Sequence, residues 1–288
     1  MSTSAGFGAA GAAGEPLLSV GIVVFRSDPA LLVRTLESLE RAILALGAAR
    51  AAGCTVTVID NGPADGVPAL DALLAGFPRD PAGPRPVLAA GHGNVGYGRG
   101  NNLAIERSRA RYHLVLNPDA ELEPDALVAG IGHLERDPGV GMVAATAFGP
   151  DGHALRLCKR RPSILVLALR AMPPRWVPRV ARPMLEGYDV VPAADGCTDV
   201  TGLLVSGSFM LCRCAVLQAV GGFDPRYFLY FEDFDLSLRI GERARLHWLA
   251  DVRLLHHGGK AAAKGWAHRR MFAASALRFF ATHGWRIA

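Results

Sequence analysis

The stretch from Leu17 to Phe25 reads LLSVGIVVF, a continuous apolar run rich in β-branched residues. Such a run is typical of a strand buried on both faces of a parallel sheet. Ser27 or Asp28 can cap the helix that follows, and Pro29 suits its first position. Leucine and isoleucine then recur at helical spacing as far as Gly47, so the pattern predicts a strand followed by an amphipathic helix.

The alternation of strand and helix continues along the first half of the chain. Further strands are expected over 54–59, 86–90, 112–116 and 140–148. This order predicts a doubly wound α/β fold with a mostly parallel central sheet, in which ligands bind beyond the carboxyl ends of the strands. Polar clusters follow three of the predicted strands at that edge: Ser27-Asp28, Asp60-Asn61 and Asn117-Pro118-Asp119.

The second half of the chain has a less regular pattern. An irregular, Pro-rich segment is expected over 173–192, one strand over 200–212 and another over 246–249. An aromatic turn and an acidic cluster lie between these two strands, and a pair of histidines follows them. The members are Tyr227, Phe228, Tyr230 and Phe231, then Glu232-Asp233-Phe234-Asp235, and then His256-His257-Gly258-Gly259.

Composition and charge limit the class of protein. The 288 residues are 50% hydrophobic, which suits one large domain or two closely fused halves. The net charge of +5 fits nucleic acid, an anionic membrane or a phosphorylated substrate. Because the basic residues are scattered and the aromatic residues lie beside acids, we expect no nucleic-acid partner.

The N-terminal sequence, the short apolar runs and the pattern of cysteines predict a cytoplasmic protein. Residues 1–16 have the small, flexible composition of a disordered tail, rich in alanine, glycine and serine, and no apolar run approaches the ~20 residues that span a bilayer. The five cysteines are odd in number and irregularly spaced, which disfavours a disulfide framework and indicates a reducing compartment. Cys212 and Cys214 fit structural thiols better than a zinc site, because no second pair lies nearby in the sequence.

Three groups of residues could carry chemistry at the sheet edge. Asp119 follows an apolar strand, where a carboxylate can hold Mg²⁺ or Mn²⁺ against the phosphates of a substrate. A positioned carboxylate can take a proton from an attacking hydroxyl, which makes Asp233 the candidate base and Glu232 a group that orients the acceptor or the loop. One of His256 and His257 is a candidate for contact with the metal or the diphosphate.

The Gly-rich loop over 92–100 is a further candidate, for nucleotide binding. Its glycines allow close approach of the backbone to a ligand, and its asparagines and the following helix start offer donors to anions. The loop lacks the spacing of a Gly-x-x-x-x-Gly-Lys-Ser/Thr phosphate loop. A flexible loop with a capped helix fits the same residues.

These motifs together resemble the family 2 glycosyltransferases of the rhamnosyltransferase-like kind, which have the nucleotide-diphosphosugar transferase (GT-A) fold. The resemblance covers about residues 17–260. It rests on an ordered set of motifs: Val20 to Phe25, Val58-Ile59-Asp60-Asn61-Gly62, Asn94-Val95-Gly96 with Gly100-Asn101-Asn102, Leu116-Asn117-Pro118-Asp119, Val205-Ser206-Gly207-Ser208-Phe209, Gly221-Gly222-Phe223-Asp224, Tyr230 to Leu236, and His256 to Gly259.

The resemblance implies an inverting transfer of a sugar from a nucleoside-diphosphate donor to an acceptor hydroxyl of a cell-envelope glycan or another molecule. Rhamnose on deoxythymidine diphosphate is the first expectation for the donor, and uridine-diphosphate sugars are the next. It also implies a catalytic domain over 17–260, with 17–120 as the nucleotide-binding half and 121–260 as the acceptor-binding half. A C-terminal helical segment would follow over 261–288.

The resemblance also implies roles for individual residues. Asp119 and His256 would hold the divalent metal, with Asn117 in place of the first acid of an Asp-x-Asp motif, and Asp233 would be the base. The donor site would include Asp60, Asn61, Asn94, Gly96, Gly100, Asn101, Asn117 and Gly207. Arg26-Ser27 stands where the family usually has an asparagine, which is a departure from the pattern at the donor site.

Two rival functions and one open question remain at the level of sequence. A sugar-nucleotidyltransferase should carry a basic Gly-rich loop directly after the first strand, and this chain does not. A non-catalytic nucleotide-sugar-binding protein would not need Asp119, Asp233 and His256. The aromatic and basic segment 264–286 fits either a helix that rests on an anionic membrane or a helix packed on the core.

Overall fold

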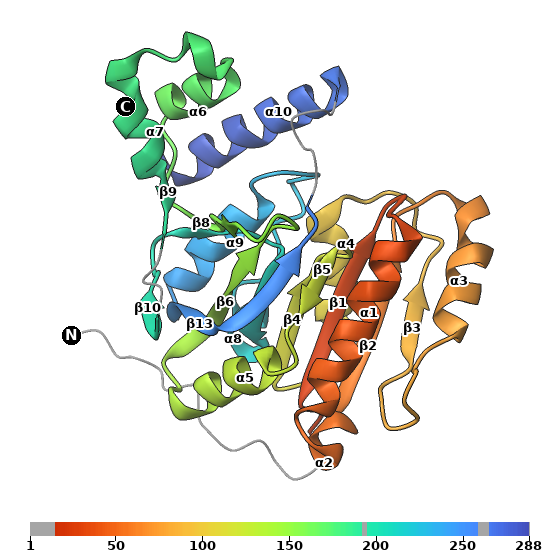
Figure 1. The fold of residues 1–288 in the computed structure, drawn as a ribbon. Helices are drawn as coiled ribbons and strands as arrows, with labels where there is room; N and C mark the ends of the chain where they lie inside the picture. Colours follow the sequence, from red (N-terminus) through yellow and green to blue (C-terminus); the bar gives the residue numbers. More distant parts are fainter. Residues whose placement is uncertain (1–14, 192–194, 259–264, 288) are drawn as a thin grey trace.

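The structure is a computed structural model, and it describes residues 15–191, 195–258 and 265–287. A large mixed sheet with the strand order β10-β13-β6-β12-β4-β1-β2-β3 forms its centre (Figure 1). The elements of the first half are β1 (Leu18–Val24), α1 (Pro29–Leu44), α2 (Ala48–Ala51), β2 (Cys54–Asp60), α3 (Val67–Ala75), β3 (Pro86–Ala89), α4 (Tyr97–Arg107), β4 (Tyr112–Leu116), β5 (Ala120–Leu122), α5 (Ala126–Arg136) and β6 (Val140–Phe148).

The second half completes the large sheet and adds a small sheet with the order β11-β8-β9. Its elements are β7 (Ala154–Leu155), β8 (Cys158–Lys159), α6 (Ile164–Ala171), α7 (Arg182–Tyr188), β9 (Asp189–Val190), β10 (Cys197–Asp199), β11 (Leu204–Val205), β12 (Phe209–Arg213), α8 (Cys214–Ala219), α9 (Glu232–Gly241), β13 (Arg245–His256) and α10 (Trp266–His283). Short 3-10 turns cover 64–66, 174–176 and 179–181.

Strand direction brings the predicted polar clusters to one edge. β3, β2, β1 and β4 are parallel, so β1, β2 and β4 all end at the same edge of the sheet. β12 runs antiparallel to β4 and starts at that edge, because Phe209 lies opposite Leu116. β13 is parallel to β6 and also ends there, and its last residues pair with β5. The doubly wound α/β class is thus confirmed, with β12 as the antiparallel strand inside the sheet.

Helices cover both faces of the sheet. On one face, Leu36, Leu39 and Ile43 of α1 and Leu127 and Ile131 of α5 pack against the strands. On the other face, α4, α8 and α9 supply a second core. Asp28 caps α1 by accepting a 2.8 Å hydrogen bond from the amide of Ala30, as the sequence predicts.

Three predicted elements differ from the structure. The single strand expected over 200–212 is broken at Ser206-Gly207-Ser208, because β11 joins the small sheet while β12 joins the large one. The strand expected over 246–249 continues to His256 through a register shift. The irregular segment expected over 173–192 contains α7 and β9, since Tyr188 is buried and anchors this segment.

The C-terminal helix α10 packs on the aromatic turn. Phe279 and Phe280 are buried together with Tyr227 and Phe231, and the ring centroids of Phe231 and Phe279 lie 5.3 Å apart. In Figure 1, α6, α7 and α10 form a layer beside the sheet. No described helix combines the length and the apolar character needed to cross a membrane. The tail predicted over 1–16 falls mostly on residues 1–14, which lie outside the described residues, as do Gly259, Lys260 and Lys264.

Candidate active site

The turn after β4 places Asp119 against the end of β13. In the antiparallel pairing of β5 with β13, Ala120 lies opposite His256, and the amide of His257 donates a 3.0 Å hydrogen bond to the carbonyl oxygen of Asp119. The side chains then meet, since Nε2 of His256 lies 3.3 Å from Oδ1 of Asp119. The two residues predicted to hold a metal therefore lie side by side.

Asn117 completes this cluster. Its Nδ2 atom lies 3.2 Å from the same Nε2 atom of His256. Burial raises the pKa of Asp119, but the hydrogen bond and charge of His256 outweigh this effect and hold that pKa below its usual value. The carboxylate is therefore ionised at neutral pH. A carboxylate oxygen beside an imidazole nitrogen is a donor set that fits Mn²⁺, and Mg²⁺ less well.

His257 and Glu121 form a separate pair beside the cluster. The imidazole of His257 contacts the carboxylate of Glu121, and Nε of Arg34 lies 2.8 Å from the same carboxylate. Glu121 is thus held in an ion-pair network and is not free in solvent. This pairing assigns the two histidines different environments, with only His256 facing Asp119.

Tyr97 connects the Asp119 cluster to the acidic helix. Its hydroxyl lies 2.9 Å from Oδ1 of Asn117 and 2.7 Å from the carbonyl oxygen of Gly207. The amide of Gly207 in turn donates a 2.8 Å hydrogen bond to Oδ2 of Asp233. A continuous series of polar contacts therefore joins Asp119 to Asp233. Tyr97 could not be singled out from the sequence, although it lies within the Gly-rich motif, because nothing in the sequence distinguishes its ring from that of a packing residue.

The acidic helix α9 begins at an unusual backbone conformation. Tyr230 and Phe231, just before it, have φ values of 71° and 66°, which non-glycine residues rarely adopt. Packing of Phe231 against Phe272 and Phe279 of α10 holds this turn. Such conformations cost of order 1–3 kcal/mol each and persist where the surroundings impose them, often at functional sites.

Two carboxylates at the start of α9 have raised pKa values. Burial and the neighbouring charge of Asp233 raise the pKa of Glu232 to about 8. Burial also raises the pKa of Asp233, against the lowering effect of hydrogen bonds from the amides of Gly207 and Phe234. Oε2 of Glu232 is buried without a hydrogen-bond partner among the described residues. Two adjacent carboxyl groups that resist ionisation form an arrangement suited to proton transfer.

Most of the remaining residues of the aromatic and acidic segment pack against, or form ion pairs with, other parts of the protein. Tyr227 and Phe231 are buried against α10, so only the more exposed Phe228 and Tyr230 are accessible for stacking on a sugar ring. Asp235 does not cap α9. Its carboxylate instead lies 2.7 Å from Nη2 of Arg239 and 2.8 Å from Nε2 of His283, which ties α9 to α10.

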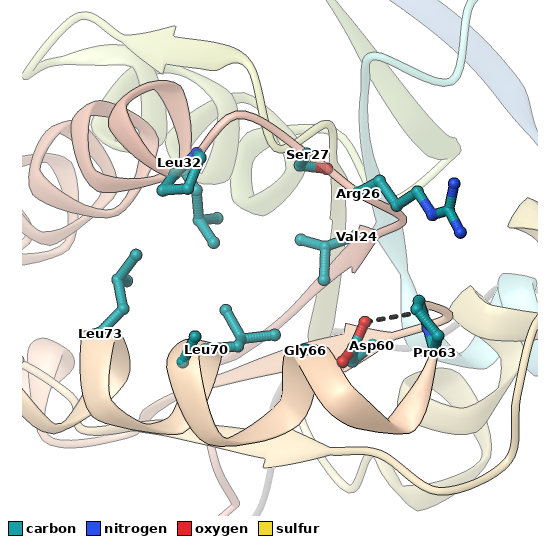
Figure 2. A pocket seen from close by; sticks show the side chains of 12 residues that line it. Val24, Arg26, Ser27, Leu32, Asp60, Pro63, Gly66, Leu70 and Leu73 are labelled. Atoms are coloured by element: carbon teal, nitrogen blue, oxygen red, sulfur yellow. Dashed lines mark hydrogen bonds between the residues drawn. The ribbon is translucent and has the colours of Figure 1, made fainter.

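A cavity of about 340 Å³ opens beside the ends of β1 and β2. Figure 2 shows Asp60 and Arg26 at one end of the cavity, and Leu70 and Leu73 of α3 at the other. Asp60 is held in place because one of its oxygens accepts a 2.7 Å hydrogen bond from the amide of Gly62. The shape offers an apolar wall with one carboxylate and one guanidinium, which suits a flat polar ring that carries an anionic group.

The Gly-rich loop is fastened to this region mainly by its backbone. Nδ2 of Asn61 donates a 2.9 Å hydrogen bond to the carbonyl oxygen of Gly96, and Oδ1 of Asn94 accepts one from the amide of Gly96. Gly100 packs on Val23, where a Cβ atom would come within 3.0 Å of that side chain. Asn101 is fully buried and donates to the carbonyl oxygen of Tyr97. Of these residues only Asn94 is exposed, so the others fix the conformation of the loop through buried contacts.

The chain is similar to known proteins in sequence as well as in fold. The family model described as Glycosyl transferase family 2 matches residues 19–165. The chain is 29% identical over 231 residues to the N-acetylglucosaminyl-diphospho-decaprenol L-rhamnosyltransferase of Mycobacterium tuberculosis, covering 76% of this chain and 71% of that protein. It is 28% identical over 175 residues to the rhamnosyltransferase WbbL of Escherichia coli, covering 57% of this chain and 62% of that protein.

A solved structure supports the fold. The mannosyltransferase PcManGT from Pyrobaculum calidifontis, in complex with GDP-Man and Mn²⁺, is similar with a TM-score of 0.55. The match has 14% sequence identity and covers 94% of this chain and 76% of that chain. The expected glycosyltransferase architecture is thereby confirmed.

Proposed function

Because the chain belongs to glycosyl transferase family 2 and is a glycosyltransferase, we propose that it moves rhamnose from a nucleoside-diphosphate donor, with inversion, to a lipid-linked cell-envelope glycan precursor. The observation that carries this proposal is the series of contacts from Asp119 through His256, Asn117, Tyr97 and Gly207 to Asp233. It supplies a metal-binding end for a diphosphate and a carboxylate end for an acceptor within one site.

The donor is assigned to the cavity at the ends of β1 and β2. Asp60 faces the base edge of the nucleoside, and Arg26 offers its positive charge to the diphosphate. Asn61 supports the Gly-rich loop through Gly96, and Gly100 and Asn101 hold the helix that follows. Asn94 is the loop residue placed to contact the donor directly, because its side chain is exposed.

Asp119 and His256 would hold a divalent metal, with Asn117 as their neighbour. Such a metal supplies Lewis-acid stabilisation of the negative charge on the departing diphosphate. The contact of 3.3 Å between Oδ1 of Asp119 and Nε2 of His256 supports the assignment, because it brings the two ligand atoms close together. Glu121 and His257 hold the strands beneath these ligands, since they pair with each other.

Asp233 would act as the base. A raised pKa makes this carboxylate a better proton acceptor near neutral pH, and the amide of Gly207 fixes one of its oxygens. The acceptor hydroxyl attacks the anomeric carbon from the face opposite the diphosphate while Asp233 takes its proton. A single displacement of this kind inverts the configuration. Glu232, protonated at neutral pH, keeps a second negative charge away from Asp233 and orients the turn.

The identity of the sugar and acceptor is carried over from relatives. The names of two similar proteins specify rhamnosyl transfer, and one of them specifies a decaprenyl-diphosphate acceptor. A lipid-linked acceptor requires access to a membrane surface. The layer of α6, α7 and α10 carries exposed apolar side chains and arginines that fit this need: Ile164, Leu165, Met184, Trp266, Leu277, Trp285, Ile287, Arg269, Arg270 and Arg278.

Sedimentation with lipid vesicles tests the membrane contact. The protein should bind vesicles that contain anionic phosphatidylglycerol and release them at high salt. Trp266→Ala with Trp285→Ala should weaken binding, whereas Val87→Ala, at an exposed apolar residue of the edge strand β3 outside this layer, should weaken it less. Equal binding to purely neutral vesicles would argue against an anionic surface as the partner.

A donor and acceptor panel tests the proposed activity. Deoxythymidine-diphosphate rhamnose, uridine-diphosphate glucose and guanosine-diphosphate mannose are each incubated with polyprenyl-diphosphate N-acetylglucosamine, with and without Mn²⁺. We expect product only with a pyrimidine donor and a metal, with rhamnose preferred. If every donor raises Tm without any transfer or hydrolysis, the chain is a nucleotide-sugar-binding protein instead.

A further inference from the structure

A second cluster of metal-binding side chains lies away from the candidate active site. His133 near the end of α5, Cys197 at the start of β10 and His247 near the start of β13 each offer one ligand atom to a common point. Nε2 of His133 lies 2.9 Å from Nδ1 of His247, and Sγ of Cys197 lies 3.2 Å from Nδ1 of His247 and 4.0 Å from Nε2 of His133.

The sheet register explains why these residues meet. β10 pairs antiparallel with β13, with Cys197 opposite Leu249 and Asp199 opposite His247. Because alternate residues of a strand share a face, Cys197 and His247 are diagonal neighbours on the same side of the sheet. Helix α5 packs against β13 on that side and brings His133 over the pair.

The spacing matches the ligands of a tetrahedral zinc ion. Zinc binds imidazole nitrogen at about 2.0 Å and thiolate sulfur at about 2.3 Å, which places two ligand atoms about 3.3–3.6 Å apart. The three separations of 2.9, 3.2 and 4.0 Å bracket this range. Adjustments of about half an ångström, within the reach of side-chain torsions, would give the ideal geometry.

We propose that His133, Cys197 and His247 bind a zinc ion that ties the edge strand β10 to β13 and α5. A thiolate with two imidazoles is a soft donor set, which favours zinc over the Mg²⁺ or Mn²⁺ expected at Asp119. Cys197 is exposed, so a water molecule from solvent can fill the fourth position.

This site is separate from the candidate active site. His247 lies near the start of β13 and His256 at its end, so the two sites lie at opposite ends of this strand. A metal ion bound by His133, Cys197 and His247 would stabilise the folded protein. β10 is short and exposed at its Cys197 end, and a metal shared with α5 would hold this edge strand in place.

Titration of the metal-free full-length protein with Co²⁺ tests the proposal. Tetrahedral Co²⁺ bound to a thiolate gives intense visible bands and a near-ultraviolet sulfur-to-metal charge-transfer band. We expect one equivalent to produce both, Zn²⁺ to displace the Co²⁺, and Zn²⁺ to raise Tm. Cys197→Ser should remove the charge-transfer band, and His133→Ala and His247→Ala should each weaken binding at least tenfold.

Matched variants distinguish this site from other metal binding. Asp119→Ala, at the candidate active site, should leave the cobalt spectrum unchanged, and so should Cys54→Ser, which alters a buried thiol elsewhere. A spectrum without thiolate bands, or one that survives in Cys197→Ser, would overturn the proposal. Since Cys197 and His133 are not buried, circular dichroism should show both variants folded.

Discussion

The hydroxyl of Tyr97 lies 2.7 Å from the carbonyl oxygen of Gly207, at the midpoint between the two ends of the candidate site. Burial and the nearby carboxylates of Asp233, Glu232 and Asp119 raise the pKa of this phenol, so it keeps its proton and remains a donor. Tyr97 thus holds the Gly207 turn, and through it Asp233, in a fixed relation to Asn117. It is a positioning residue, because its contacts are with other protein groups.

Tyr97→Phe should therefore lower kcat more than it lowers stability. The ring would keep its edge-to-face packing on Phe223, while loss of a buried hydrogen bond costs about 1–3 kcal/mol, or roughly 5- to 150-fold in rate. Steady-state transfer kinetics and a Tm measurement check this. Tyr112→Phe is the matched control, since that buried hydroxyl has no partner among the described residues. Equal kcat in both variants would exclude a positioning role for Tyr97.

Gly96→Ala should destabilise the protein strongly. Gly96 has φ +89°, and a Cβ atom there would lie 2.2 Å from the carbonyl oxygen of Phe228, so the loop and the aromatic turn would have to separate. Gly93→Ala is the matched control, because Gly93 has φ +67° but nothing within 4 Å. The control should lose only about 1–2 kcal/mol of unfolding free energy. Equal losses in urea unfolding would show that the contact with Phe228 is unimportant.

Stability should depend on the protonation of Glu232. Its pKa is about 8 in the folded protein, raised from an ordinary value of 4.5, so the folded state holds this proton in a range where the unfolded chain has lost it. The stabilisation is complete below about pH 4.5 and falls as the pH rises towards 8. Glu232→Gln should remove this fall, so its Tm relative to wild type should rise between pH 5 and pH 8.

The matched control for the pH prediction is Glu242→Gln. Glu242 is exposed just beyond the end of the same helix, so this variant should keep the pH dependence of the wild type. Parallel Tm curves for wild type and Glu232→Gln over that range would contradict the assignment of a neutral, buried carboxyl group to Glu232.

Removal of the metal, or of its ligands, should abolish transfer. A chelator should stop the reaction and Mn²⁺ should restore it, while Asp119→Ala and His256→Ala should lower kcat/KM on the order of a hundredfold or more. His257→Ala is the control, because the imidazole of His257 contacts Glu121 and not the carboxylate of Asp119, and the backbone hydrogen bond from His257 to Asp119 survives the substitution. The assignment of the metal to Asp119 and His256 would be contradicted if His257→Ala is as inactive as His256→Ala, or if a chelator does not change the transfer rate.

Much of the fold could be predicted from local sequence. The run from Leu17 to Phe25 is apolar on both faces of the strand, as burial inside a sheet requires, and the predicted strands at 54–59, 112–116 and 140–148 agree with β2, β4 and β6 within a residue. The break at Ser206-Gly207-Ser208 could not be predicted. It depends on two sheets competing for one segment, and that competition exists only in the folded protein.

The proximity of the candidate site residues was predictable in part. Asp119, His256 and Asp233 each belong to a recognisable motif, and sheet direction brings the first two into contact. Tyr97 and the cluster around Cys197 were not foreseen, because their roles arise from contacts between segments far apart in the chain. Sequence spacing carries information about neighbours on one helix or strand, and very little about contacts between distant segments of the chain.

The most direct test of the account is the activity of Asp233→Asn measured beside its donor affinity. Asparagine keeps the shape of the side chain and can still accept the hydrogen bond from Gly207, but it cannot take a proton at neutral pH. We predict that donor binding in the presence of Mn²⁺ changes less than threefold, while kcat for transfer falls on the order of a thousandfold or more. An Asp233→Asn enzyme that transfers sugar at the wild-type rate would contradict the central claim.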